Sequence, residues 1–411
     1  MNQSLRHFAL FSVLAAALFG ARSVPVSRVP EPGRLVLERA VLPAPSRNTR
    51  WQEQALLLAG RPLPPESPFY ELSVCPSFRR HAEAMQVFWE QVRKDSLDAM
   101  ISWREKNVPR NLVRNPVFYP LSGADYLNAY ALFPQAPQYT FIALEAPGTM
   151  PDLYQMTETE REAGLAAIRR AVATVASVNY MKSKILRKEL SNTYIPGTLP
   201  VFLLLAGGLG HIVDDVRPVI LDESGNIRDS WWDSANSSPQ VPRKQSVASV
   251  VRGLRMVVRD PESGQSKVII YLQVRLRKEA VSTATREGKY LRGIHNCNTI
   301  FKAAVYLLHN DEYDAVREFV LDRSDLILQD DSGLPYRLFR PEDWAEHLFG
   351  SYTRIPPLGG IPDPPQQPVL AKRFRESSEP LLFPYGYGVL QGKGKSNLML
   401  FVKKSPRAGL R

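Results

Sequence analysis

The chain has 411 residues, of which 44% are hydrophobic and 23% charged, and its formal net charge is +11. This composition is typical of a globular protein with a substantial core. The basic excess favours an anionic partner, such as an anionic polymer or a membrane surface, and the alternative is a solvated basic C-terminus that keeps the protein soluble. The aromatic residues do not alternate with Lys and Arg as in a nucleic-acid-binding motif, so that class of partner is not indicated.

The first 23 residues have the layout of a secretory signal peptide. Arg6 gives a positively charged N-terminal region, residues 8–19 form an apolar stretch, and Ala21 and Ser23 are small residues before a cleavage site. The apolar stretch is shorter than the roughly 20 residues of a transmembrane helix. We therefore expect an exported protein, periplasmic or extracellular, with no membrane-spanning segment.

Composition divides the rest of the chain into three parts. Residues 24–68 are rich in Pro and Arg and predict an extended arm. Residues 69–354 carry the periodic patterns of one main globular domain. Residues 355–411 begin with a Pro/Gly linker and continue as a basic tail, with a final strand over residues 397–403.

Several helices and strands are predicted in the first half of the main domain. An i, i+3, i+4, i+7 apolar pattern predicts an amphipathic helix over residues 77–106, and Thr157 with Glu160 predicts a capping box that opens a helix to residue 178. Residues 115–146 predict a strand, a helix and a second strand, which together make a βαβ unit. A further helical stretch is expected to residue 190, and an apolar helix over residues 199–209.

The second half predicts a strand at 216–221 and an antiparallel hairpin near 253–276, where apolar and polar residues alternate in both arms. Helices are predicted at 296–308, 314–321 and 344–349, and a short strand at 325–329. Helices and strands in irregular alternation indicate an α/β or α+β fold, with a mixed sheet and flanking helices.

The two cysteines, Cys75 and Cys297, predict one disulfide, because an exported protein meets an oxidising environment. Two alternatives remain open at this point. In the first alternative, both cysteines are buried free thiols. In the second, Cys297 is a nucleophile assisted by His295, whose side chain would lie on the same face of a strand.

The loop of the βαβ unit is the first candidate site. Ser122 and Gly123 precede a helix that Asp125 would begin, and free amides at a helix start can bind an anion. Glu145 lies where an acidic residue would bind a ribose hydroxyl. In outline, this unit resembles the nucleotide-binding half of Rossmann-like enzymes, including methyltransferases that use S-adenosylmethionine. The alternative is an ordinary βαβ unit in which Asp125 caps the helix.

Two further groups of residues are candidates for chemistry. His211, Asp214 and Asp215 have side chains that ligate divalent metals or serve as a general base with an orienting carboxylate. A helix end followed by a loop is the alternative for them. Asp330 and Asp331 follow a predicted strand and are candidates for an acid–base pair, or for an ordinary tight turn.

The strings NPVFYPLSGADYLNAYALFP, TFIALE and LILQDDSGLPYR resemble those of an uncharacterised family of exported bacterial proteins. That resemblance implies export and a shared fold, but it supplies no activity to transfer to any residue, and the cofactor stays unknown. Two functions are therefore expected. One is a binding or envelope-associated protein with an anionic partner. The other is an enzyme, methyltransferase-like or a hydrolase, with a site around residues 122–125 that includes His211 or Asp330.

Overall fold

The described chain has a mixed α/β fold, in which a β-sheet of parallel and antiparallel strands is covered by helices on both faces. The structure is a computed structural model, and it describes residues 49–180, 183–190, 193–232, 239–240, 251–355, 357 and 364–404. The predicted signal peptide and most of the predicted arm lie outside the described residues. Among the described helices, none combines the length and apolar character needed to cross a membrane.

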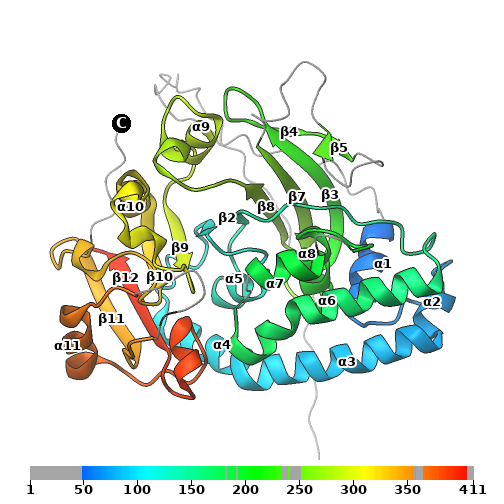
Figure 1. The fold of residues 1–411 in the computed structure, drawn as a ribbon, viewed down its shortest axis with the longest axis horizontal. Helices are drawn as coiled ribbons and strands as arrows, with labels where there is room; N and C mark the ends of the chain where they lie inside the picture. Colours follow the sequence, from blue (N-terminus) through cyan, green and yellow to red (C-terminus); the bar gives the residue numbers. More distant parts are fainter. Residues whose placement is uncertain are drawn as a thin grey trace, which may run out of the picture. The chain divides into compact units, whose positions relative to one another are not determined.

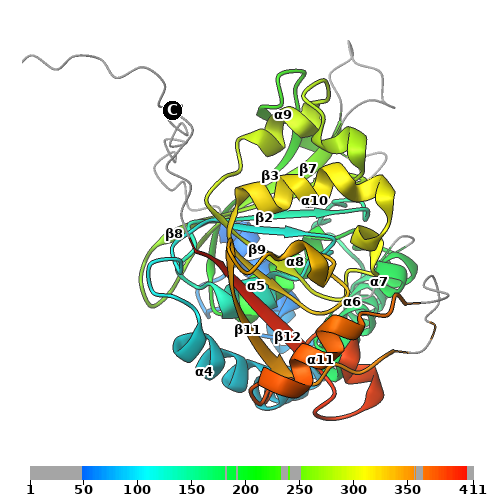
Figure 2. The same cartoon turned by 90° about the vertical axis from the view of Figure 1, so that its left-hand side faces the viewer.

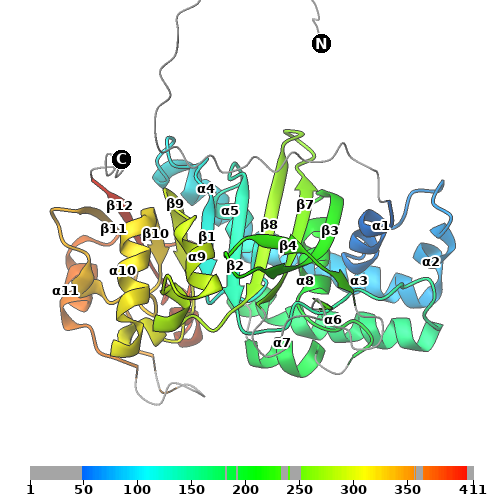
Figure 3. The ribbon, with the colours of Figure 1, turned by 90° about the horizontal axis from the view of Figure 1, so that it is seen from above.

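The main sheet has ten strands in the described part of the chain, in the order β11-β12-β10-β9-β1-β2-β8-β7-β3-β4. Figure 3 shows this order from β11 and β12 on the left to β7 and β3 on the right. The strands are β1 (Val117–Pro120), β2 (Gln138–Ala143), β3 (Ile212–Leu221), β4 (Ile227–Asp229), β7 (Arg252–Arg259), β8 (Ser266–Gln273), β9 (Cys297–Phe301), β10 (Ser324–Gln329), β11 (Trp344–Gly350) and β12 (Asn397–Lys403). Strands β5 (Trp231–Trp232) and β6 (Pro239–Gln240) form a separate pair.

The centre of the sheet is parallel and its two sides are antiparallel. Strands β8, β2, β1, β9 and β10 pair in parallel. On one side, β12 pairs antiparallel with both β10 and β11, and on the other side β7, β3 and β4 continue from β8. If the strands from β8 to β11 are numbered among themselves in chain order, they lie as 3-2-1-4-5-7-6.

Helices cover both faces of this sheet. They are α1 (Thr49–Leu58), α2 (Tyr70–Val74), α3 (Pro76–Val92), α4 (Asp98–Asn107), α5 (Tyr126–Leu132), α6 (Glu158–Val178), α7 (Ser183–Leu190), α8 (Leu199–Gly208), α9 (Arg286–Arg292), α10 (Asp314–Arg323) and α11 (Pro368–Ser377). In Figure 1, α9 and α10 lie to the upper left of the central strands β8 and β9, and α3 and α6 lie below these strands. Figure 2 shows α11 beside the edge strand β11 and its neighbour β12.

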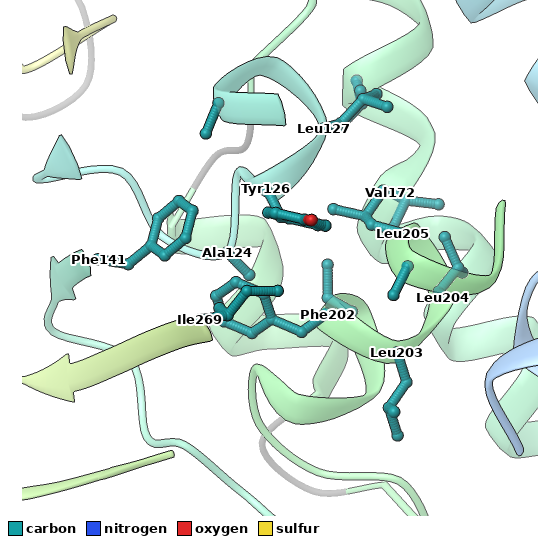
Figure 4. Close-up of a cluster of buried hydrophobic side chains, with 14 of the residues drawn as sticks. Ala124, Tyr126, Leu127, Phe141, Val172, Phe202, Leu203, Leu204, Leu205 and Ile269 are labelled. Atoms are coloured by element: carbon teal, nitrogen blue, oxygen red, sulfur yellow. The ribbon is translucent and has the colours of Figure 1, made fainter. Parts of the chain in front are cut away.

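Strand residues alternate between two hydrophobic clusters, one on each face. Tyr119 and Val117 of β1 belong to the cluster that contains α5, α6 and α8, and Phe118 belongs to the cluster that contains α9, α10 and α11. Figure 4 shows the first cluster, in which Tyr126, Phe141 and residues of α8 pack together. This alternation follows from the two-residue repeat of a strand, and it buries both faces of the parallel centre.

Most of the predicted elements are present. The predicted helix over 77–106 corresponds to α3 and α4, which a π-helical turn at Arg93–Leu97 joins. The βαβ unit corresponds to β1, α5 and β2, and the hairpin to β7 and β8. The capping box at α6 is confirmed, because the side chains of Thr157 and Glu160 each accept from the other's backbone amide. The mixed α/β fold is therefore confirmed.

Two predicted helices are wrong. Residues 297–301 form strand β9 and residues 344–350 form strand β11. All five residues of β9 are buried, including Asn298 and Thr299, so the sequence lacks the apolar–polar alternation that identifies a half-buried strand. Its neighbours β1 and β10 cover its two edges, and this pairing with distant residues decides its structure.

Two predicted boundaries also need correction. The arm was expected to reach residue 68, but residues 49–58 form α1, in which Ala55 and Leu58 are fully buried. The final strand was expected in a basic tail after a linker. Strand β12 instead lies inside the sheet, between β10 and β11, so residues 397–403 belong to the main domain.

The predicted disulfide is wrong, because Cys75 and Cys297 are both free. Cys75 precedes α3, and its Sγ lies 3.2 Å from the Ser77 hydroxyl. Cys297 begins β9 and is fully buried, and this burial raises the pKa of its thiol to about 11. Such a thiol stays protonated at neutral pH, which also argues against the nucleophile assisted by His295.

Candidate functional site

The carboxyl ends of β1 and β9 form the switch point of the sheet. The chain passes from β1 through α5 to β2 on one side, and from β9 through α10 to β10 on the other. Helices α5 and α10 contribute to opposite hydrophobic clusters, so these two crossovers cover opposite faces. Ligands of doubly wound sheets bind outside the carboxyl ends of the strands at such a point. The loops after β1, β2, β9 and β10 are therefore the candidate site.

The loop between β1 and α5 contains three of the predicted residues, Ser122, Gly123 and Asp125. The Ser122 hydroxyl donates to the backbone carbonyl of Tyr119, near the end of β1, at 2.7 Å. Asp125 is the N-cap of α5, and its carboxylate accepts from the backbone amide of Asn128 at 3.4 Å. Because a carboxylate occupies the first turn of this seven-residue helix, the helix offers no binding position for a phosphate.

Asp125 is paired with Lys302, the first residue after β9. The Lys302 Nζ lies 2.8 Å from the Asp125 Oδ2, and the two side chains are 0% and 2% exposed. Lys302 also donates to the carbonyl of Asn179, the C-cap of α6, and lies 5.8 Å from the ring centroid of Tyr385. Burial lowers the pKa of Lys302, and the charges of Asp125 and Asp330 act in the opposite direction. A buried cation thus links the loops after β1 and β9.

Asp330 and Asp331 follow β10 directly, and both are buried. Asp330 accepts from the Ser332 hydroxyl at 2.7 Å. Asp331 accepts from the Tyr306 hydroxyl at 2.6 Å and from the Asn397 amide at 2.9 Å. Burial raises the pKa of both carboxyl groups, and the charge of Asp331 raises the pKa of Asp330 further. Carboxyl groups with raised pKa at this edge of a sheet are suited to proton transfer.

Backbone strain is concentrated at the same place. Ala303, Val305 and Tyr306, which follow β9, have φ of 54°, 61° and 52°, and Leu121, which follows β1, has φ of 61°. A non-glycine residue in this left-handed region costs about 1–3 kcal/mol, and the conformation is least favourable for a β-branched residue such as Val305. Four of the six residues of this kind in the described chain therefore lie beside the switch point. Such strain persists where the surrounding structure enforces it, often at functional sites.

Glu145 follows β2 at the same edge of the sheet. The residue is 4% exposed, and neither of its carboxylate oxygens has a hydrogen-bond partner among the described residues. Its backbone carbonyl accepts from the Tyr271 hydroxyl at 2.7 Å. A buried carboxylate that accepts no hydrogen bond is costly, and burial together with the charge of this carboxylate raises the pKa of the neighbouring Tyr271.

His211 lies at the opposite end of the strands. It precedes Ile212, which pairs with Arg259, and Arg259 pairs with Ser266 at the start of β8. The ring is fully buried, with its Nδ1 3.1 Å from the Tyr126 hydroxyl, and burial lowers the pKa of His211 to about 4. The structure therefore brings Asp330, and not His211, to the loop that contains Asp125.

Asp214 and Asp215 are both neutralised by arginines. The Asp214 carboxylate lies 2.5 Å from the Arg259 guanidinium, and the Asp215 carboxylate lies 2.8 Å from that of Arg217. The register of β3 shifts between Val213 and Asp215, which places Asp214 in a β-bulge. Across the described ranges, no group of three His, Cys, Asp or Glu side chains could hold a metal ion.

A groove of about 880 Å³ lies away from the switch point, at the end of α10 and the start of β11. Four basic and four acidic side chains line it, together with Phe319 and Trp344. Several of the charges pair with one another, as Arg340 does with Asp343. Because both signs are equally represented, the groove does not select an anion by charge.

Lys302 and Tyr306 are the central residues that the sequence did not reveal. Both lie in the stretch that was predicted as a helix, where a Lys and a Tyr four residues apart carry no special meaning. The sequence offered one signal for these two residues, which is that they precede the Asp330–Asp331 pair in the chain. Their roles depend on Asp125 and Asp331, which contact them from other loops.

No protein-family model, no curated protein and no solved structure matches this chain. The resemblance to an uncharacterised family of exported bacterial proteins therefore stays a prediction, as does export itself. The function has to be inferred from the arrangement of the side chains described above.

Proposed function

We propose that the chain is a Rossmann-like enzyme that binds a nucleoside cofactor at the carboxyl ends of β1 and β2. Strands β8, β2, β1, β9 and β10 lie in the order 3-2-1-4-5 of doubly wound dinucleotide-binding sheets. Beyond the fifth strand, β12 lies antiparallel between β10 and β11. This argument is an analogy of fold, and the site has to support it independently.

The free carboxylate of Glu145 is the observation that carries the proposal. In Rossmann-like enzymes, an acidic side chain after the second strand accepts hydrogen bonds from the ribose. Glu145 follows the second strand of this sheet, and no described residue donates a hydrogen bond to either of its buried carboxylate oxygens. Two neighbouring hydroxyl groups of a ribose would supply the two missing donors.

The loop after β1 favours a cofactor without phosphate groups. The Asp125 carboxylate occupies the first turn of α5, where a pyrophosphate would otherwise bind, and Lys302 is already paired with that carboxylate. S-adenosylmethionine is a nucleoside without phosphate, and when bound it supplies a methyl group on a sulfonium for transfer to a nucleophile. Asp330 and Asp331 lie at the same edge and would hold or release a proton there.

Isothermal titration with S-adenosylmethionine, adenosine and NAD tests this proposal. We expect the first two to bind, and NAD, which carries a pyrophosphate, not to bind measurably. Glu145→Gln should weaken adenosine binding about tenfold or more, because a hydrogen bond to a charged group contributes about 1.5–3 kcal/mol. The exposed control Glu279→Gln should leave binding unchanged. If none of the three binds, or if Glu145→Gln binds adenosine as the wild type does, the proposal fails.

The net charge of +11 favours a second candidate function, a binding or envelope-associated protein with an anionic partner. Retention on a heparin support at physiological salt would support it. Elution below that salt concentration would reject it, because salt screens the non-specific attraction between exposed charges and the support.

A further inference from the structure

Residues 303–309, here called the cover segment, lie against the buried Asp330–Asp331 pair. Three hydrogen bonds attach the segment to the turn at 330–332. They join the Ala303 amide to the Asp330 carboxylate (3.3 Å), the Ala304 amide to the Ser332 hydroxyl (2.7 Å) and the Tyr306 hydroxyl to the Asp331 carboxylate (2.6 Å). On its outer side the segment exposes Val305, which is 38% accessible. Together with Gly386 and Tyr387, which contact the Asp330 carboxylate, it separates the two carboxyl groups from solvent.

Both ends of the cover segment are fixed. Lys302, which precedes it, is held in the buried ion pair with Asp125. At the other end, the Arg317 guanidinium of α10 donates to the backbone carbonyls of Leu308 and Asn310 at 2.8 and 2.7 Å. Movement of the segment is thereby confined to the residues between these two anchors.

Three of the residues between the anchors have strained backbone conformations. Ala303, Val305 and Tyr306 all have positive φ, and bonds from Ala303 and Tyr306 to the 330–332 turn hold the stretch on both sides of Val305. When these bonds break, the strain is released. The strain therefore favours an open segment, and the bonds favour a closed one. Asp331 does not depend on the segment for its position, because its backbone amide and its Oδ1 both bond to Asn397 of β12.

We propose that the cover segment is a strained lid, which opens between its two anchors and exposes the Asp330–Asp331 pair at the carboxyl edge of the sheet. That the lid gives a substrate access to an active site rests on the proposed function. The opening itself does not, because it is a property of the ligand-free chain.

Hydrogen exchange of the ligand-free protein, followed by mass spectrometry, tests the lid with two variants of opposite effect. Tyr306→Phe removes one bond that closes the lid, and we expect exchange of the cover-segment amides to become about tenfold faster. Val305→Gly removes the least favourable positive φ, and we expect the same amides to exchange about threefold more slowly. In a segment that does not open, the two substitutions would not change amide exchange in opposite directions.

Two controls complete the experiment. Tyr154→Phe removes a hydroxyl bonded to Glu53 at 3.1 Å, a bond that involves neither the cover segment nor the 330–332 turn, and should leave exchange of the cover segment unchanged. Val369→Gly places glycine at an exposed position of α11 without positive φ, and should not slow exchange there. If Tyr306→Phe speeds exchange equally throughout the chain, or if neither lid variant changes the segment, the lid is rejected. These exchange measurements use no nucleoside. Failure of the lid and failure of the proposed function are therefore distinguishable.

Discussion

The buried ion pair between Lys302 and Asp125 is expected to dominate the stability of the candidate site. Lys302→Met leaves the Asp125 carboxylate buried without its cation, and we expect the free energy of unfolding to fall by about 3–5 kcal/mol in urea titrations. Lys106→Met is the matched control, since Lys106 pairs with Glu379 at 3.1 Å with both side chains more than half exposed. It should cost less than about 1 kcal/mol. Equal losses in the two variants would contradict a special role for the buried pair.

Two fully buried histidines should make the protein sensitive to acid. Burial lowers the pKa of both His81 and His211 from 6.5 to about 4. The stability that each neutral ring contributes is therefore complete above pH 6.5 and is lost as the pH falls toward 4, by about 3 kcal/mol for each ring. Unfolding free energies measured at pH 7, 6 and 5 should fall less steeply for His211→Phe than for the wild type. An unchanged slope would show that His211 does not carry this effect.

At the level of elements, the capping box of α6 supports the helix that ends beside Lys302. Thr157→Ala removes the side-chain oxygen that accepts from the Glu160 amide, and we expect a loss of about 1 kcal/mol in the free energy of unfolding. Thermal and urea unfolding provide the measurement. Thr283→Ala, at an exposed position outside the helices, should change stability by less than half of that amount. If the two substitutions cost the same, the cap does not stabilise α6.

Elements with strong local signals were predictable, and elements that depend on pairing were not. The hairpin of β7 and β8 consists of two apolar runs on either side of a turn that contains Pro261 and Gly264, and α6 begins with two residues that cap it. Strand β9 has neither signal, because each of its residues is buried between β1 and β10. A short, fully buried stretch cannot be assigned to helix or strand from its periodicity alone.

At the level of the whole molecule, the free thiols lead to a direct measurement. Because Cys75 and Cys297 do not pair, unfolded protein prepared without reductant should react with two equivalents of a thiol reagent. In the folded protein the partly exposed Cys75 should react first, and dithiothreitol should not change the unfolding midpoint. Fewer than two reactive thiols, or a lower midpoint after reduction, would indicate a disulfide.

The candidate site was only partly predictable. Asp125, Glu145, Asp330 and Asp331 were identified because acidic residues after strands are common ligands and acid–base groups. His211 was expected to join them, but β3 begins at the opposite edge of the sheet, so its position follows from the strand order. The direction of a strand within a sheet depends on its partners, which no short stretch of sequence contains.

The sequence by itself determined what neighbouring residues decide together: the α/β class, the βαβ unit, the hairpin and the start of α6. Only the tertiary structure decided that β9 is a strand, that Cys75 and Cys297 stay apart, and that Lys302 meets Asp125. Hydrogen bonding and burial within one element act over a few residues, whereas strand pairing and a buried ion pair join residues that are distant in the chain. The switch point, where the candidate site lies, is a property of the strand order.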